Sequence, residues 1–324
     1  METIKAVAPA KVNLLLAIGE RQPDGYHKAT TVMHALAMHD TLEVSLVERG
    51  EHVQLLEPGD AAQPLRQVEL EAAPDSGLAV SANTLWSAGL DPIVIPDEDN
   101  LACRAVHLLA NATDRNEDEH VRLVIRKEIP HQTGLGGGST DAAAALVAAA
   151  NLWGIPLESP VLAECAKQLG ADVAFFLRGG CALLQGRGDE YDHALPARKE
   201  PVVVVKPAQG VSTAQAYALF DDSPVPTEDS TLADAHAAAH AAEVPLHNNL
   251  APAAEVLLPE LADIRTFALE QPGVRAALLC GSGSGTFCIC EDFSTAHQLV
   301  SAATRAGWWA RATSFAPWGA SLLP

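Results

Sequence analysis

Hydrophobic residues recur along this 324-residue chain at two different spacings, which predict a mixture of strands and helices. Long apolar runs predict strands at Ile4–Ala10 and Val12–Ile18, formed as two strands or as one bent strand around "PAK". A β-rich run at Thr30–Val47 is expected to continue the same sheet. Shorter apolar runs predict further strands within residues 121–130, 179–189, 201–207, 276–290 and 308–315.

Apolar positions three and four residues apart predict the helices. Asp99 or Asn100 can cap the first of them, and Gly154 with Pro156 ends the second. The helices are expected at about 101–112, 142–153, 160–169, 250–269 and 293–307. Because strand pairs alternate with helices and no internal repeat is present, the pattern predicts an α+β fold.

Two segments lack a clear period. Residues 48–95 are rich in turn-forming residues and are predicted to be a surface insertion, with or without a short hairpin. Residues 221–247 are rich in Ala, His and Asp and predict a loop around a short helix. Its histidines, His236, His240 and His247, have no carboxylate that completes a metal motif, so a solvated helix face is favoured.

The amino-acid composition and the net charge indicate which classes of protein this chain can belong to. Hydrophobic residues make up 48% of the chain, as in a globular protein, and its length is enough for two domains. Aromatic residues make up only 5%, so aliphatic residues and alanine must fill the core. The 41 acidic and 21 basic residues give a net charge of −20, which argues against nucleic acid or an anionic membrane as partner. Any phosphate site must therefore be built locally.

The six cysteines show no zinc spacing and are expected to be buried thiols in a reducing compartment. The N-terminus does not have the pattern of a signal peptide, and no run approaches the ~20 apolar residues of a membrane span. We therefore expect a cytoplasmic protein with no membrane partner.

The densest local signal is the stretch "TGLGGGSTDAAAA", which has four glycines between Gly134 and Gly138. The Walker pattern fails because Ser139 follows the last glycine in place of lysine, and GxGxxG fails at the same residue. Glycines nevertheless let N–H groups converge on an anion, and the loop leads into a helix N-terminus with its free donors. Ser139 or Thr140 is expected to cap that helix and Asp141 to stabilise its N-terminus. The stretch predicts a polyphosphate site; the alternative is a tight strand-to-helix connection.

"PHQTGLGGGSTDAAAAL" resembles the phosphate loop of the GHMP kinase superfamily. Three further blocks occur in the same order as in one branch of it, which phosphorylates a cytidine diphosphate-linked polyol in non-mevalonate isoprenoid synthesis. These blocks are "APAKVNLLLAIGERQPDGYH", "LGADVAFFLRGG" and "CGSGSGTFCI". The likeness extends from residue 8 to about 290. The sequence departs from the family pattern in two places. The residues at 131–133, "HQT", stand where relatives often carry small residues, and tuning of adenine binding or loop packing is expected there; the segment at 48–95 is longer than expected for the branch.

The resemblance implies a two-domain α+β protein. Residues 1–198 would form an N-terminal ATP-binding domain like ribosomal protein S5, carrying the insertion at about 48–95. Residues 199–324 would form a ferredoxin-like domain that completes the substrate cleft. The implied state is a monomer or a homodimer.

The resemblance also implies site residues, with ATP and Mg²⁺ as cofactors. The nucleotide would be held by Pro130, Gly134, Leu135, Gly136, Gly137, Gly138, Ser139 and Thr140. Asp172 would accept the proton of the substrate hydroxyl, and Lys11 would stand beside it and polarise that hydroxyl. Without the resemblance, Asp172 reads as a helix-junction residue and Lys11 as an edge lysine. The Mg²⁺ ligands are not identified, and Ser139 or Thr140 are candidates.

The other end of the substrate would be recognised by aromatic residues. Tyr26 would stack on the cytosine, His27 would read its edge, and Asn13, on the same strand face as Lys11, would hydrogen-bond the substrate. Tyr217 corresponds by position to an aromatic residue that closes the far side of the base. The alternatives are a solvent-exposed Tyr-His at a hairpin tip and a core tyrosine.

The glycines at 281–285 would face the substrate phosphates, or form only a β-turn. The residues alone indicate polyphosphate binding and phosphoryl transfer. Two alternatives to the branch remain: another GHMP kinase, acting on homoserine or a mevalonate-like alcohol, and a catalytically silent nucleotide binder.

Overall fold

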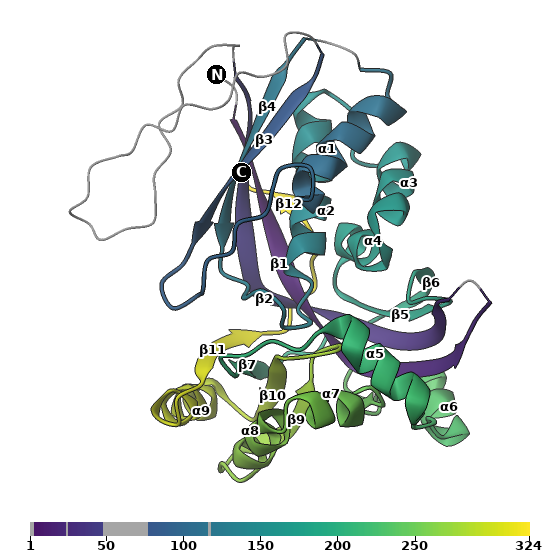
Figure 1. Cartoon of the computed structure of the whole chain (residues 1–324), viewed down its shortest axis with the longest axis vertical. Coiled ribbons are helices and arrows are strands. Elements are labelled where there is room, and N and C mark those ends of the chain that lie inside the picture. Colours follow the sequence, from purple (N-terminus) through teal and green to yellow (C-terminus); the bar gives the residue numbers. More distant parts are fainter. Residues whose placement is uncertain (1–2, 24, 48–76, 116–117) are drawn as a thin grey trace.

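The computed structural model describes residues 3–23, 25–47, 77–115 and 118–324, which contain two β-sheets and nine helices (Figure 1). The strands are β1 (Thr3–Arg21), β2 (His27–Val47), β3 (Ala79–Trp86), β4 (His120–Lys127), β5 (Cys181–Gln185), β6 (Glu190–Leu195), β7 (Pro201–Lys206), β8 (His247–Asn248), β9 (Val274–Leu279), β10 (Thr286–Cys290), β11 (Trp309–Ser314) and β12 (Ser321–Leu322). The helices are α1 (Leu101–Ala112), α2 (Gly137–Leu152), α3 (Pro160–Leu169), α4 (Ala171–Arg178), α5 (Thr213–Asp222), α6 (Asp229–Ala237), α7 (Ala251–Leu257), α8 (Glu260–Leu269) and α9 (Phe293–Arg305).

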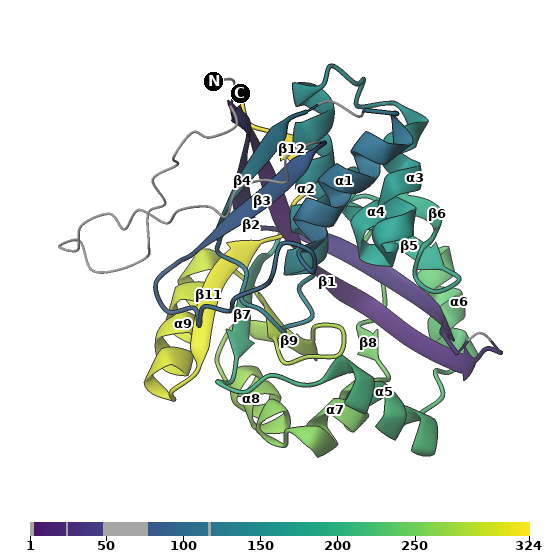
Figure 2. The same ribbon diagram turned by 45° about the horizontal axis from the view of Figure 1, so that its top comes forward.

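The first sheet is built on the long antiparallel pair of β1 and β2. Its strand order is β12-β1-β2-β4-β3, with β5 and β6 attached through β2 and β8 beside β1. β1 is one bent strand, because its pairing with β2 shifts register next to Pro9 and again after Asn13. Helices α1 to α4 cover one face of this sheet (Figure 1). The β1–β2 pair extends beyond them and reaches α5 and α6 (Figure 2).

The second sheet is antiparallel and has the order β11-β7-β10-β9. Helices α8 and α9 pack on it, and the chain order from β7 to β11 is that of a ferredoxin-like domain. The predicted α+β class is confirmed. Among the described helices, none has the length and apolarity needed to cross a membrane.

The structure corrects the prediction for residues 48–95. Residues 48–76 lie outside the described part, but residues 79–86 form β3, which pairs in parallel with β4 at the edge of the first sheet. The run "AVSANTLW" shows no strict alternation of apolar and polar residues. Ala79 is buried and the other seven side chains are partly buried, so they are not split between a buried and an exposed face. The period-two signal is therefore missing from a genuine strand.

The end of the chain returns to the first sheet. The Ala316 N–H donates to the carbonyl of Ala35 at 2.9 Å, the Ala320 N–H donates to the carbonyl of Phe176 at 2.7 Å, and β12 then pairs with β1. Gly179, which ends α4, packs so closely on this tail that a Cβ there would lie 2.0 Å from the backbone nitrogen of Gly319. The tail therefore fixes the position of α4.

Alanine fills much of the core, as the composition predicted. Every residue of α2 from Ala142 to Ala150 is buried, and its small side chains let α1, α4 and β1 approach it closely. All six cysteines are free and buried, as expected.

We expect His34 in β2 to make the fold sensitive to acid. Its ring is fully buried, donates from Nδ1 to the carbonyl of Ala35 at 2.9 Å and accepts at Nε2 from the Arg198 N–H at 3.0 Å. Burial lowers the pKa of His34 from 6.5 to about 4. The unfolded chain therefore takes up this proton first as the pH falls from 6.5 to 4, which removes about 2 kcal/mol of stability between pH 7 and pH 5.

Urea unfolding of the wild type and of His34→Gln at several pH values tests this expectation. The variant should be less stable at pH 7, and the difference from the wild type should shrink by about 2 kcal/mol at pH 5. Parallel pH profiles for the two proteins would contradict it.

Candidate active site

The glycine loop connects β4 to α2 and is held by close backbone packing. Gly134 and Gly136 have left-handed φ values of +73° and +75°. A Cβ on Gly134 would lie 1.9 Å from the carbonyl oxygen of Cys280, and one on Gly136 would lie 2.8 Å from the ring of Phe176. The glycines are thus required by the neighbouring backbone and ring as well as by any bound anion.

The structure corrects the predicted start of the following helix. α2 begins at Gly137, earlier than a cap at Ser139 or Thr140 would place it, with the left-handed Gly136 at the N-cap position. None of the described side chains caps it, so the predicted capping role of Ser139 or Thr140 is wrong. Thr140 is fully buried and its hydroxyl has no partner among the described residues, whereas Ser139 is half-buried. An uncapped first turn leaves N–H donors available to a ligand.

A cavity of about 260 Å³ opens beside this loop. Its walls come from β3, the segment before α1, β4 and the loop itself. The lining includes Thr84, Trp86, Ile93, Ile95, Asn100, Leu101, Lys127, His131, Asp141 and the whole of Gly134–Gly138. Part of the segment interpreted as an insertion therefore forms a wall of the cavity, which the sequence did not indicate.

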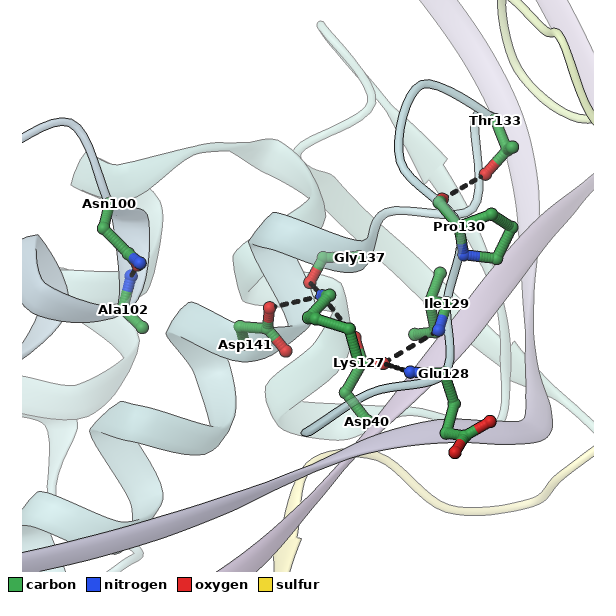
Figure 3. Close-up of polar contacts among 10 residues, drawn as sticks. All are labelled: Asp40, Asn100, Ala102, Lys127, Glu128, Ile129, Pro130, Thr133, Gly137 and Asp141. Carbon is green, nitrogen blue, oxygen red and sulfur yellow. Dashed lines mark hydrogen bonds and ion pairs between the residues drawn. The ribbon is translucent and has the colours of Figure 1, made fainter. Parts of the chain in front are cut away.

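Lys127 lies beneath the loop in a buried ion-pair network (Figure 3). Its ammonium contacts Asp40 and Asp141, with 2.5 Å between Nζ and Oδ2 of Asp141, and lies 3.5 Å from the carbonyl oxygen of Gly137. Asp40 also accepts from the backbone N–H groups of Glu128 at 2.6 Å and of Ile129 at 2.8 Å. The network ties β2, β4 and the first turn of α2 together directly under the glycines.

The electrostatics of this network keep the lysine charged. Burial opposes its ammonium, but Asp141 and Asp40 together raise the pKa of Lys127. Burial also raises the pKa of Asp141 well above its ordinary value, against the attraction of Lys127. The expected role of Asp141 at the helix N-terminus is corrected, because its carboxylate pairs with a lysine that precedes the loop. The sequence gives no signal for this role of Lys127, because the known glycine motifs carry their lysine after the glycines and Lys127 precedes them.

The structure brings Lys11 and Asp172 together next to the loop. Lys11 Nζ lies 3.5 Å from Asp172 Oδ2 and donates to Asn13 Oδ1 at 2.9 Å. The Lys11 side chain is only 6% exposed, whereas that of Asp172 is 30% exposed in the first turn of α4. The Lys11 N–H also donates to the carbonyl of Leu135 at 3.0 Å, so β1 is bonded directly to the loop. Asn13 in turn donates to Thr31 Oγ1 at 2.8 Å.

A second cavity, of about 310 Å³, contains this pair together with Asn13, Gly134, Gly136, Tyr217, Gly281 and Ser282. The glycine turn at 281–285 lies directly against the phosphate loop, since the Ser284 N–H donates to the carbonyl of Gln132 at 3.0 Å and the Gly285 N–H to that of Thr133 at 3.2 Å. The glycine turn therefore contacts the phosphate loop and also lines this cavity.

The aromatic residues gather around a third cavity of about 600 Å³. The His27 ring lies 5.3 Å from that of Tyr217, and its Nε2 is 2.5 Å from Asp221 Oδ1. Burial first, and then the charge of Asp172, raises the pKa of Tyr217. Tyr26 is 58% exposed and lines the same cavity. Asp221 has no distinguishing signal in the sequence and was missed.

The histidines of the 221–247 segment do not gather at one place: His236 lies 3.9 Å from Asp192, and His240 lies 3.5 Å from Glu243. His247 hydrogen-bonds Thr227, and His236 and His240 are exposed. Within the described residues, no three His, Cys, Asp or Glu side chains form a group that could hold a metal ion.

We expect Gly134→Ala to destabilise the protein strongly. The added methyl group meets the Cys280 carbonyl and the residue must also keep a left-handed φ, which together cost about 2–4 kcal/mol of unfolding free energy. Gly138→Ala is the control, because its Cβ would meet only Leu101 at an ordinary 3.8 Å within a helix. Urea unfolding measures both, and equal effects for the two variants would contradict the packing argument.

Comparisons with known proteins show the family. The family model for the GHMP kinases N terminal domain matches residues 100–180, and that for the GHMP kinases C terminal domain matches residues 230–307. The 4-diphosphocytidyl-2-C-methyl-D-erythritol kinase of Pelotomaculum thermopropionicum is 35% identical over 92% of this chain and 92% of that relative. The kinase of the same name from Thermobifida fusca is 36% identical over 92% and 91%.

Solved structures show the same relationship. A crystal structure of 4-(cytidine 5'-diphospho)-2C-methyl-D-erythritol kinase is similar with a TM-score of 0.70 and 31% identity, covering 96% of this chain and 99% of that one. A homoserine kinase from Cytophaga hutchinsonii has a TM-score of 0.68 at 16% identity, covering 100% and 98%, and shares the fold.

Proposed function

The chain belongs to the 4-diphosphocytidyl-2-C-methyl-D-erythritol kinase family of GHMP kinases, and we propose that it transfers the γ-phosphoryl group of ATP to the 2-hydroxyl of 4-diphosphocytidyl-2-C-methyl-D-erythritol. The observation that carries the proposal is the position of the Lys11–Asp172 pair. One cavity holds this pair together with Gly134 and Gly136 of the loop and Tyr217 of the aromatic group. A single substrate can thus present its hydroxyl to Asp172 while its base lies among aromatic side chains.

In this proposal the glycine loop binds ATP. The uncapped N-terminus of α2 supplies N–H donors and partial positive charge to the phosphates of the nucleotide. The residues from Pro130 to Thr140 form this seat, and the cavity beside Trp86 takes the rest of the nucleotide. The network around Lys127 fixes the loop from beneath.

Asp172 accepts the proton of the substrate hydroxyl. Its carboxylate is partly exposed to the cavity, and Lys11 lies 3.5 Å from it, where the ammonium can also contact the hydroxyl oxygen and stabilise its developing charge. Asn13 fixes Lys11 by accepting its hydrogen bond, and Thr31 fixes Asn13. Lys11 and Asp172 thus form a preorganised pair next to the phosphate loop.

Tyr26, His27 and Tyr217 bind the cytosine. Tyr26 offers an exposed ring face, and His27 offers a ring edge that Asp221 orients through its 2.5 Å contact with Nε2. With Nε2 engaged, His27 Nδ1 is the nitrogen that can read the base. Tyr217 closes the cavity between His27 and Asp172.

Mg²⁺ is part of the proposal because it neutralises the charge of the polyphosphate. Ser139, half-buried in the first turn of α2, is the hydroxyl that fits as a protein ligand, whereas that of Thr140 is fully buried. The division of the chain after residue 198, a cytoplasmic location and a monomeric or homodimeric state also remain predictions.

The test is turnover of a panel of alcohols. The purified chain, ATP and Mg²⁺ are incubated separately with the diphosphocytidyl polyol, homoserine and mevalonate, and ADP release is followed. We expect kcat/KM for the diphosphocytidyl polyol to exceed that for the other alcohols by at least about 1,000-fold. Preference for homoserine or mevalonate would support a different GHMP kinase, and ATP binding without turnover of any alcohol would support a silent nucleotide binder.

A further inference from the structure

Helix α5 presents three side chains to the ring of His27 at the start of β2. Tyr217, Phe220 and Asp221 are spaced at i, i+3 and i+4, so they lie on one face of the helix. The His27 ring lies 5.3 Å from the ring of Tyr217 and 6.2 Å from that of Phe220, to which it is nearly perpendicular. The His27 side chain is only 8% exposed, although it lines the cavity of the aromatic residues. Its ring is therefore held in one orientation by α5.

Asp221 determines which nitrogen of this ring carries a proton. Its Oδ1 lies 2.5 Å from His27 Nε2, and its Oδ2 lies 3.5 Å from Nη1 of Arg21. An ionised carboxylate can only accept hydrogen bonds, so Nε2 is the donor in this contact. Nδ1 of the neutral ring then carries a lone pair, and it has no hydrogen-bond partner among the described residues. The second ring nitrogen is therefore an acceptor for a molecule in the cavity.

The two common pyrimidines differ at the group that would meet such an acceptor. Cytosine carries an amino group, which donates, where uracil carries a carbonyl oxygen, which only accepts. A lone pair on Nδ1 binds the amino group and repels the carbonyl oxygen, whereas a protonated Nδ1 would do the reverse. We propose that Asp221 is a positioning residue that makes the site selective for cytosine over uracil, because it holds His27 in the tautomer with the proton on Nε2; this inference rests on the proposed function.

Competitive inhibition by two nucleotides tests the selectivity. CDP and UDP are used as inhibitors against the diphosphocytidyl polyol at pH 8 and at saturating ATP, which keeps both out of the nucleotide cavity. We expect the wild type to bind CDP about 10- to 100-fold more tightly than UDP, because UDP loses one hydrogen bond and places two acceptors face to face.

Asp221→Asn should lower this preference for CDP by about 5- to 10-fold. The amide can donate as well as accept, so both tautomers of His27 become possible, and the one with a proton on Nδ1 accepts uracil. CDP should therefore bind more weakly while UDP binds as well as before or more tightly. Because Asp221 lies at the base end of the substrate, kcat should stay within about 2-fold of the wild type and the KM for the diphosphocytidyl polyol should rise.

Asp222→Asn is the matched control. Asp222 is the next residue of α5, is exposed and does not line the cavity of the aromatic residues. It removes the same charge, so both inhibition constants should equal those of the wild type. Equal weakening of CDP and UDP in Asp221→Asn would show that Asp221 only supports the packing of α5, and this result would overturn the inference. An unchanged affinity for both nucleotides would overturn it as well.

The tautomer can also be observed without a substrate. A nitrogen–proton NMR correlation spectrum distinguishes the two ring nitrogens, and His27→Gln identifies the signals of His27 by their loss. We expect the wild type to carry a proton on Nε2 and none on Nδ1, and Asp221→Asn to show a mixture of both tautomers. A wild-type His27 ring with a proton on Nδ1 would contradict the role of Asp221.

These outcomes separate the inference from the proposed function. If the wild type turns over the diphosphocytidyl polyol and the preference for CDP over UDP is the same in Asp221→Asn, the kinase assignment stands and the role of Asp221 is refuted. If the wild type neither turns over that substrate nor is inhibited by CDP, the proposed function fails and the inference fails with it.

Discussion

Asp172→Asn is expected to lower kcat by about 100- to 10,000-fold, the range that a positioned general base contributes. The amide keeps the shape of the carboxylate in the first turn of α4 but cannot accept the hydroxyl proton. Asp172 pairs with Lys11 at 3.5 Å and, among the described residues, forms no hydrogen bond with the glycine loop, so the KM for ATP should stay within a factor of about three. Steady-state ADP release at saturating substrates measures the effect.

Asp234→Asn is the control for Asp172→Asn, since it removes the same charge from an exposed position on α6. Its kcat should equal that of the wild type. An Asp172→Asn protein with more than about a tenth of the wild-type kcat would remove proton transfer to this aspartate from the mechanism. A loss of the same size in Asp234→Asn would mean that overall charge, rather than the Lys11–Asp172 pair, governs the rate.

Lys127→Met is expected to cost about 3–5 kcal/mol of unfolding free energy, the usual result of removing one partner from a buried ion pair. Methionine fills a similar volume but leaves Asp40 and Asp141 buried and facing each other without an ammonium. Since the same ammonium lies under Gly137, the KM for ATP should also rise. Urea unfolding and ATP titration measure the two effects.

Two further measurements, stability at lower pH and a second substitution, test whether the stability lost in Lys127→Met comes from the buried ion-pair network. Burial already raises the pKa of Asp141, so its carboxylate takes up a proton readily in the variant, and the deficit of Lys127→Met should shrink as the pH falls from 7 to 5. Adding Asp141→Asn removes one of the two facing charges and should recover part of the lost stability. A deficit below about 1 kcal/mol that does not vary with pH would contradict a buried network under the loop.

Strong local patterns were predicted well. The apolar runs of β1, β2 and β7, the periodic helix α9 and the glycine loop carry signals set by neighbouring residues, and the structure contains all of them. The predicted ends of helices were less accurate where the backbone adopts a left-handed φ. α2 starts at Gly137 because Gly136 adopts a left-handed φ, which no side-chain capping motif announces.

The missed residues share one property: their partners are distant in the sequence. Lys127 meets Asp40 across 87 positions, and His27 meets Asp221 across 194. Each of these side chains, taken in its own segment, is an ordinary charged residue. β3 was missed for a related reason, because its place at the sheet edge depends on β4 and not on its own pattern.

The sequence by itself determined the mixed class of the fold, the position of the phosphate loop and, through resemblance, the candidate roles of Lys11 and Asp172. Only the tertiary structure decided that β1 bonds to the loop at Leu135, that Lys127 lies beneath the loop, and that Tyr217 lines both the cavity of the Lys11–Asp172 pair and the cavity of the aromatic residues. The reason is physical: secondary structure and loop conformation follow from interactions over a few residues, whereas ion pairs and cavity walls depend on which distant segments pack together.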